Sequence, residues 1–254
     1  MQKVITLFTL FLIIVFLFSC RNKPGKIFNS EASDTEKTTS TSDKNNTDLN
    51  NREQEQQTVT DIEGNVYKTV KIGNQTWMAK NLKTTKFNDG TAIPLVAEGT
   101  AWAALTTPGY CWYDNDSASY KNLYGALYNW YAVNSDKLCP ANWHVPSDAE
   151  WTRLANYLGG DIFAGDRLKE TGTDFWVSPN TGATNESGYT ALPGGLRYHD
   201  GVFHDFGFSG YWWTSTEYSS TRAYFDYMDY EYSNVFRFNN LKQNGFSVRC
   251  LRDY

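Results

Sequence analysis

The hydrophobic and polar residues of this chain divide it into three parts. The first part is a run from Val4 to Phe18 that is apolar apart from Thr6 and Thr9 and is preceded by Lys3. A helix of about 15 residues spans only about 22 Å, which is shorter than the roughly 30 Å hydrocarbon core of a bilayer. The pattern therefore predicts an export signal peptide over residues 1–19 rather than a permanent membrane span.

The second part, residues 20–57, is almost free of apolar side chains and consists mainly of Ser, Thr, Asn, Asp, Glu, Lys and Gln. Such a composition cannot bury enough surface to offset the entropy lost on ordering, so we predict a disordered tether. A coil of this length has a root-mean-square extension of about 35 Å, which would hold a domain clear of lipid headgroups. A solvated interaction tail is the alternative interpretation.

Cys20 stands where the apolar run ends. Ser19 precedes it directly and Leu17 lies three residues before it, an arrangement that resembles a bacterial lipobox. In signals of that class the cysteine is diacylated, the peptide is cleaved before it, and the new amino terminus is acylated. The resemblance implies a lipoprotein anchored in a membrane through Cys20, since more than one acyl chain gives stable attachment. An incidental cysteine in a cleaved signal is the alternative, and Arg21 gives no indication of which membrane face carries the protein.

The third part, residues 58–254, contains the residues that dominate folded cores. All nine Trp and all seventeen Tyr lie at or after Tyr67, and aromatic residues make up 16% of the whole chain. We therefore predict that one ordered domain begins at Thr58 and occupies the rest of the chain.

The domain begins with the pattern of a β-hairpin. A β-prone run from Val66 to Ile72 is followed by Gly73 and Asn74, which can adopt the positive φ of a tight turn, and then by a return strand from Thr76 to Leu82. Within the return strand, Trp77 and Met78 are predicted to be core residues.

Two helices are predicted in the middle of the chain. Apolar residues at intervals of three and four predict the first, from Asn122 to Asn134. The second follows a capping box in which Ser147 is the N-cap and Glu150 the third helical residue, and Gly159 ends it. This capping role explains Glu150 without a catalytic function.

The remainder is predicted to be loop and strand. Residues 166–170 have the pattern of a short helical turn, and residues 175–195, rich in Gly, Pro, Asn and Ser, predict a long irregular loop. Four short strands are predicted after it, at residues 211–215, 223–229, 235–240 and 246–251. Antiparallel strands that follow two helices indicate an α+β fold rather than a doubly wound sheet.

Charge and composition exclude several functions. A net charge of −5 and a pI near 5.3, without a basic stripe, argue against nucleic-acid binding. The three histidines and four cysteines do not have zinc-ligand spacing. The cluster Asp114–Asn115–Asp116 lacks the Gly and Glu of a calcium loop, so its interpretation is a turn, and we predict neither metal nor cofactor.

Several long motifs resemble a known family. They are GNVYKTVKIGNQTWMAKNL, YCWYDND, YGALYNWYAV, LCPANWHVPSDAEW, YWWTSTE and GFSVRCLRD. Together they resemble the Fibrobacter succinogenes major paralogous domain, a family of exported bacterial proteins, over essentially all of residues 58–254. That family in turn resembles the C-type-lectin-like fold of the sulfatase-modifying, formylglycine-generating proteins, which implies two helices, short antiparallel strands and a long irregular loop region.

The cysteines left after Cys20 are Cys111, Cys139 and Cys250, which allow three single bridges and one free thiol in an oxidising compartment. The lectin-like fold ties the end of its first helix to its last strand. The resemblance therefore implies a Cys139–Cys250 disulfide and a buried free thiol at Cys111.

No catalytic constellation accompanies this resemblance. Formylglycine-generating proteins use a cysteine pair near the substrate, whereas two of the three candidate cysteines here are expected to form a structural bridge. His144, His199 and His204 have no Ser or Cys partner whose spacing indicates a charge relay. The calcium-binding triplets of sugar-binding lectins are also missing from the expected places, so we predict that the protein is not an enzyme and not a calcium-dependent lectin.

A concentration of aromatic residues near the long loop is the remaining functional signal. Trp212 and Trp213 are adjacent on a predicted strand and must point to opposite faces, so one of them could be exposed. The alternative is that the long loop covers the second face and buries both residues. The candidate ligand-binding residues are Tyr198, His199, His204, Trp212, Trp213 and Tyr218. We predict a lipid-anchored protein of the bacterial cell envelope, in the outer membrane, that binds a glycan or protein ligand. A structural envelope protein without a dedicated ligand is the alternative, and an enzyme related to the formylglycine-generating proteins is a second one.

Overall fold

The structure, a computed structural model, describes residues 58–254. The predicted signal peptide, the lipid-attachment residue Cys20 and the predicted tether lie outside the described residues. Within them, short helices combine with mainly antiparallel strands, so the mixed helix-and-sheet class is confirmed. No helix in this part of the chain is both long and apolar enough to cross a membrane.

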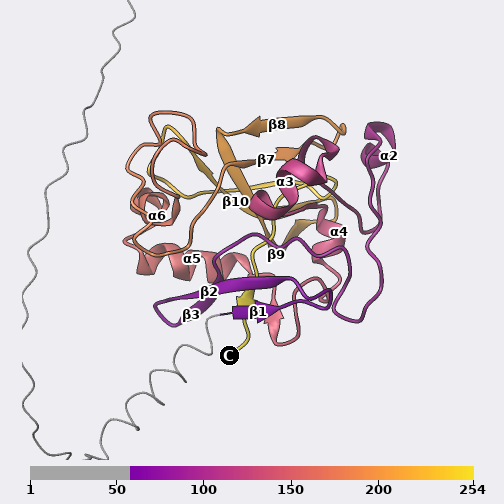
Figure 1. The fold of residues 1–254 in the computed structure, drawn as a ribbon, viewed down its shortest axis with the longest axis horizontal. Helices are drawn as coiled ribbons and strands as arrows, with labels where there is room; N and C mark the ends of the chain where they lie inside the picture. Colours follow the sequence, from indigo (N-terminus) through magenta and orange to yellow (C-terminus); the bar gives the residue numbers. More distant parts are fainter. Residues whose placement is uncertain (1–57) are drawn as a thin grey trace, which may run out of the picture. The chain divides into compact units, whose positions relative to one another are not determined.

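The first sheet brings together the two ends of the described chain (Figure 1). Its strands, in spatial order, are β1 (Thr58–Thr60), β2 (Val66–Ile72), β3 (Gln75–Met78), β12 (Leu251–Arg252) and β6 (Trp143–His144). The predicted hairpin is confirmed, since Ile72 pairs with Gln75 across a turn in which Gly73 has a φ of 59°. The return strand stops at Met78 because the chain beyond it bonds to the C-terminal segment, with Leu82 N donating to Val248 O at 2.8 Å.

The predicted helix over residues 122–134 is wrong. The chain instead forms a helix, a two-residue strand and a single helical turn: α3 (Ser117–Tyr124), β5 (Leu127–Tyr128) and α4 (Trp130–Val133). Gly125 separates them at a φ of 79°, and a Cβ at this position would lie 2.6 Å from Leu82 O. Close packing against the segment that follows β3 therefore overrides the helical periodicity.

Three short elements before α3 were not predicted. They are α2 (Gly99–Ala103), β4 (Tyr110–Cys111), which pairs with β5, and the 3-10 turn η1 (Tyr113–Asn115). The Asp114–Asn115–Asp116 cluster is a turn, as predicted. The Asp116 carboxylate caps α3 by accepting from the backbone N–H groups of Ala118 and Ser119.

The second predicted helix is confirmed as α5 (Asp148–Tyr157) with its complete capping box. Ser147 Oγ accepts from Glu150 N, and the Glu150 carboxylate accepts from Ser147 N at 2.8 Å. After Gly159 and Gly160, both at positive φ, the chain forms α6 (Asp161–Leu168). The helical turn predicted at residues 166–170 is the end of this longer helix.

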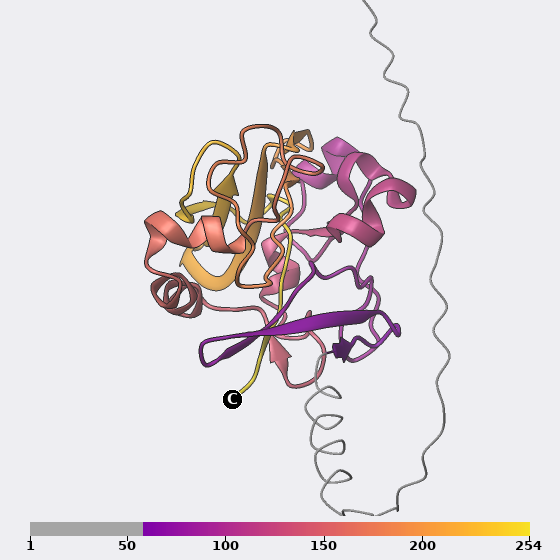
Figure 2. The ribbon, with the colours of Figure 1, turned by 60° about the vertical axis from the view of Figure 1, so that its left-hand side comes forward.

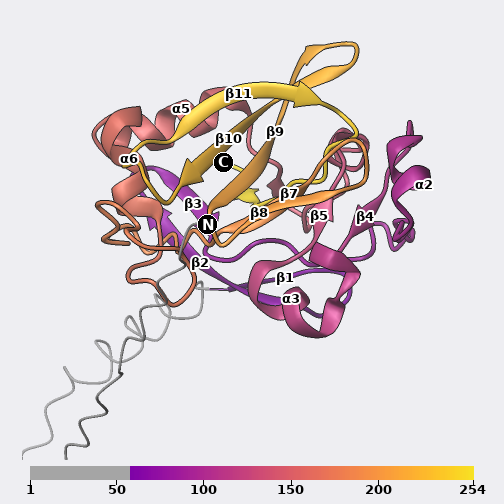
Figure 3. The same ribbon diagram turned by 90° about the horizontal axis from the view of Figure 1, so that it is seen from above.

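The second sheet holds most of the late strands, which lie side by side in Figure 3. In spatial order they are β11 (Phe236–Leu241), β10 (Arg222–Asp229), β9 (Ser209–Ser219), β7 (Gly194–Arg197) and β8 (Phe203–Phe206). Three of the four predicted strands are confirmed, whereas only the last residue of the fourth, 246–251, is in a strand. Strands β7 and β8 were not predicted, because β7 begins with glycines and β8 is short, so neither has a clear β-propensity signal.

The core has two main parts, one on each face of β9. Helices α5 and α6 pack on one face of the second sheet, as Figure 2 shows, and Trp77, Trp151 and Trp212 belong to the core on that side. Met78 and the disulfide cysteines belong to the other part. The Cys139–Cys250 disulfide is present with a Cα–Cα distance of 6.0 Å, and Cys111 is a buried free thiol.

Candidate ligand-binding groove

Trp212 and Trp213 are both fully buried, with 0% of their surface exposed. They do point to opposite faces of β9. Trp212 packs against Trp151 of α5 with ring centroids 6.3 Å apart, and Trp213 packs against Phe246 at 4.3 Å. Both indole N–H groups donate to internal acceptors at 2.9 Å. The prediction that these residues contact a ligand is wrong, because α5 covers one face of the strand and the Phe246 segment covers the other.

A row of aromatic residues crosses the second sheet on the face that carries Trp213. The strand register places Tyr211 of β9 opposite Tyr227 of β10, and Tyr227 opposite Phe236 of β11. These rings stack, with 5.4 Å between the centroids of the first pair and 4.9 Å between those of the second. Cross-strand aromatic pairs of this kind stabilise a sheet and fix its register.

A second row lies beside the first, formed by Trp213, Phe225 and Phe238 in register on β9, β10 and β11. Their exposed fractions rise from 0% at Trp213 and 5% at Phe225 to 54% at Phe238. This second row is therefore buried at β9 and opens to solvent at the edge strand β11. Exposed aromatic surface beside polar groups is a feature of binding sites.

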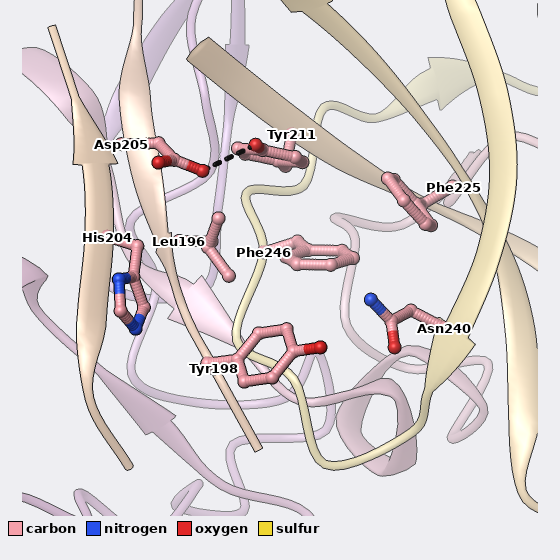
Figure 4. Close-up of a pocket in the computed structure, with 8 residues that line it drawn as sticks. All are labelled: Leu196, Tyr198, His204, Asp205, Tyr211, Phe225, Asn240 and Phe246. Atoms are coloured by element: carbon pink, nitrogen blue, oxygen red, sulfur yellow. Dashed lines mark hydrogen bonds between the residues drawn. The ribbon is translucent and has the colours of Figure 1, made fainter. Parts of the chain in front are cut away.

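This face is hollowed into two adjoining cavities, which we call the aromatic groove. The cavities share Asp205, Tyr211, Phe225 and Asn240. The first has a volume of about 330 Å³ and is completed by Leu196, Tyr198, His204 and Phe246 (Figure 4). The second, of about 590 Å³, extends over β10 and β11 and is completed by Phe208, Ser209, Tyr227, Asp229, Tyr230, Phe238 and Asn239. Both volumes fall within the range of roughly 300–1,000 Å³ that is usual for small-ligand sites.

Asp205 is held at the boundary between the two cavities by a constrained backbone. Its φ of 61° lies in the left-handed region, which non-glycine residues seldom adopt. Its Oδ2 accepts a hydrogen bond of 2.7 Å from the hydroxyl of Tyr211, drawn as a dashed line in Figure 4. Burial and this bond raise the pKa of Tyr211 well above its ordinary value, so its hydroxyl remains a neutral donor to the carboxylate.

The structure divides the remaining predicted binding residues into two groups. Tyr198 and His204 line the groove on the side of β7 and β8. His199 does not line it and packs beside Tyr198 with ring centroids 4.3 Å apart. Tyr218 is 53% exposed and packs against Tyr224 at 5.3 Å, outside the groove.

Several groove residues were missed by the sequence argument, among them Asp205, Tyr227, Phe238 and Asn240. A signal for some of them was present, because aromatic residues alternate in the segments 225–227 and 236–238 and so share a face of each strand. The register that aligns these segments, and the turn that brings Asp205 to the same face, could not be derived from the pattern.

A third cavity, of about 240 Å³, contains His144 and Ser215 beside the disulfide residue Cys139. Both ring nitrogens of His144 are occupied by carboxylates, Nδ1 by Asp253 at 2.5 Å and Nε2 by Glu150 at 3.1 Å. Neither nitrogen can accept a proton from Ser215, so this arrangement is no charge relay. Residues 58–254 also contain no cluster of three His, Cys, Asp or Glu side chains suited to a metal ion.

The carboxylates around His144 predict a pH-dependent contribution to stability. The bond to Glu150 raises the pKa of His144 above 6.5, against the opposing effect of partial burial, and the bond to Asp253 adds to the increase. The folded state thus holds this proton more tightly, so the stabilisation is complete below the ordinary pKa and is lost as pH rises through the raised value. We expect the difference in melting temperature between the wild type and His144→Gln to be larger at pH 5 than at pH 8.5. An equal difference at both pH values would contradict this role, and the exposed His204→Gln is the control.

Comparison with known proteins gives the family of the domain. The Fibrobacter succinogenes major domain model matches residues 70–252. The chain belongs to this family. The matched range covers the second sheet, all the aromatic-groove residues and both cysteines of the disulfide, whereas β1 and the first part of β2 precede it. Neither a curated protein nor a solved structure matches the chain.

Proposed function

We propose that this member of the Fibrobacter succinogenes major domain family is a non-catalytic binding module of the bacterial cell envelope. Acyl chains on Cys20 would hold it in the outer membrane, with residues 20–57 as a tether. The aromatic groove would bind a glycan or a protein segment. The C-type-lectin-like resemblance is part of this proposal, because proteins with such folds bind ligands at the surface near a long irregular loop.

The observation that carries the proposal is the combination of open aromatic rings with polar side chains in one groove. Phe238 is 54% exposed at the edge of the row, and Asp205 and Asn240 stand beside the rings. Aromatic surface supplies most of the binding energy in such sites, while a few polar groups fix the orientation of the ligand. The alternative of a structural envelope protein without a ligand gives no reason for an aromatic row that remains open at one end.

Removing an exposed ring from the groove tests the proposal. We expect Phe238→Ala to weaken binding to an array of glycans and peptides about tenfold, the loss typical of an aromatic contact at a binding site. Tyr218→Ala is the matched control, since it removes an aromatic side chain of similar exposure, 53%, outside the groove. Melting temperatures of both variants establish that they fold. Equal binding by Phe238→Ala, Tyr218→Ala and the wild type would rule out the groove as the binding site.

A further inference from the structure

Among the described residues, the lining of the aromatic groove contains acidic side chains but no basic ones of the lysine or arginine type. The acidic residues are Asp205 and Asp229. Two basic residues contact the lining without joining it. Arg222 donates to the side chain of Asn239 at 3.4 Å. Lys169, which is fully buried, donates to the backbone carbonyl of Asp229 at 3.0 Å, and its positive charge also interacts with the Asp229 carboxylate, so Asp205 is the groove carboxylate that has neither of these two cations nearby.

Both carboxylates are fixed in place by neutral donors rather than by ion pairs. Asp205 accepts from the Tyr211 hydroxyl at 2.7 Å. Asp229 accepts from the Ser209 hydroxyl at 2.8 Å and from the backbone N–H of Glu231 at 2.9 Å. Neutral donors orient a carboxylate but do not cancel its charge, so the groove presents two negative groups to whatever enters it.

The polar groups of the groove suit a ligand rich in hydroxyl donors. The carboxylates only accept hydrogen bonds, and the side-chain amide of Asn240 can both donate and accept. A sugar ring has a face of C–H groups that packs on aromatic rings and an edge of hydroxyls that donates to such acceptors. The groove also lies on the face of the sheet and is formed largely by side chains, whereas an extended peptide that adds to a sheet pairs with the backbone of an edge strand.

From this arrangement we propose that the ligand is a glycan that carries no acidic groups, and that the groove excludes glycans with carboxylate or phosphate groups. The inference rests on the proposed function of the groove and specifies its ligand. A uronic acid in the groove would place a third carboxylate beside Asp205 and Asp229, and like charges in such close proximity repel one another. An uncharged sugar or an amino sugar avoids this repulsion.

Matched oligosaccharides test the inference on the full chain in detergent. For each of several linkages, the neutral sugar, the amino sugar and the uronic acid are compared at the same chain length and at low salt, where charge effects are strongest. We expect the neutral or amino form of at least one linkage to bind at least tenfold more tightly than its uronic form. Raising the salt concentration should narrow this difference.

Charge variants identify the cause of the selectivity. Asp205→Asn with Asp229→Asn keeps the shape of the groove and one acceptor oxygen at each position, and we expect it to reduce the discrimination against the uronic form at least tenfold. The control is Asp174→Asn, which removes one carboxylate charge at an exposed position outside the groove lining. Uronic and neutral forms that bind equally, with binding lost in Phe238→Ala, would overturn the charge inference and leave the groove as a binding site. Peptide binding alone that is lost in Phe238→Ala would overturn the glycan class. Absence of binding that depends on Phe238 for every probe would overturn both the inference and the proposed function.

Discussion

Replacing Cys250 with serine is expected to lower the free energy of unfolding by about 4 to 5 kcal/mol. The bridge from Cys139 to Cys250 spans 111 residues, and cross-linking a loop of that length removes a large amount of conformational entropy from the unfolded chain. The bridge also joins the start of the β6 region to the segment that enters β12, so its loss weakens the pairing of the last strand in the first sheet. Denaturant unfolding of the wild type and the variant measures the difference.

The remaining cysteines provide the controls for this prediction. Cys139→Ser/Cys250→Ser removes the same bridge, so it should be destabilised about as much as Cys250→Ser and not twice as much. Cys111→Ala changes a buried thiol that forms no bridge and should have a much smaller effect. An unchanged unfolding midpoint for Cys250→Ser, with no newly titratable thiol at Cys139, would show that the bridge does not form in the protein.

The elements that could be derived from the sequence are those fixed by nearby residues. The capping box of α5 needs only Ser147 and Glu150, which are three residues apart, and the hairpin needs only the turn at Gly73. The prediction of one helix over residues 122–134 was wrong because the conformation of this stretch depends on a segment that is distant in the sequence. Gly125 is the residue through which the chain packs against Leu82, and an interior glycine was the one local sign of the interruption.

The candidate site shows the same dependence on distant residues. Alternation along a strand correctly placed Trp212 and Trp213 on opposite faces, but it could not indicate that α5 and the Phe246 segment cover both of them. Tyr198 and His204 were found because aromatic residues are concentrated near them in sequence. Asp205 was missed because its position depends on a backbone conformation and a partner, Tyr211, that only the folded chain provides.

The second large effect is expected at Lys169, a fully buried lysine at the end of α6. Its ammonium group donates to three backbone carbonyls, those of Thr181 at 2.9 Å, Asp229 at 3.0 Å and Tyr232 at 2.7 Å. These carbonyls belong to the long loop, to the end of β10 and to the connection between β10 and β11, respectively. Lys169 therefore ties the loop to the sheet beside Asp229, at one wall of the aromatic groove.

Lys169→Met keeps the length of the side chain and removes its three donors. We expect the free energy of unfolding to fall by about 3 to 5 kcal/mol. The reason is that the three carbonyls would stay buried without hydrogen-bond donors, so their desolvation would no longer be compensated. Proteolysis should become faster within residues 175–195, since the variant releases the loop before the whole domain unfolds. Lys137→Met is the control: it removes an exposed lysine whose partner, Asp89, is also exposed, and it should leave the midpoint essentially unchanged. If both variants unfolded at the same midpoint as the wild type, the ammonium of Lys169 would not be needed to hold the loop against the sheet.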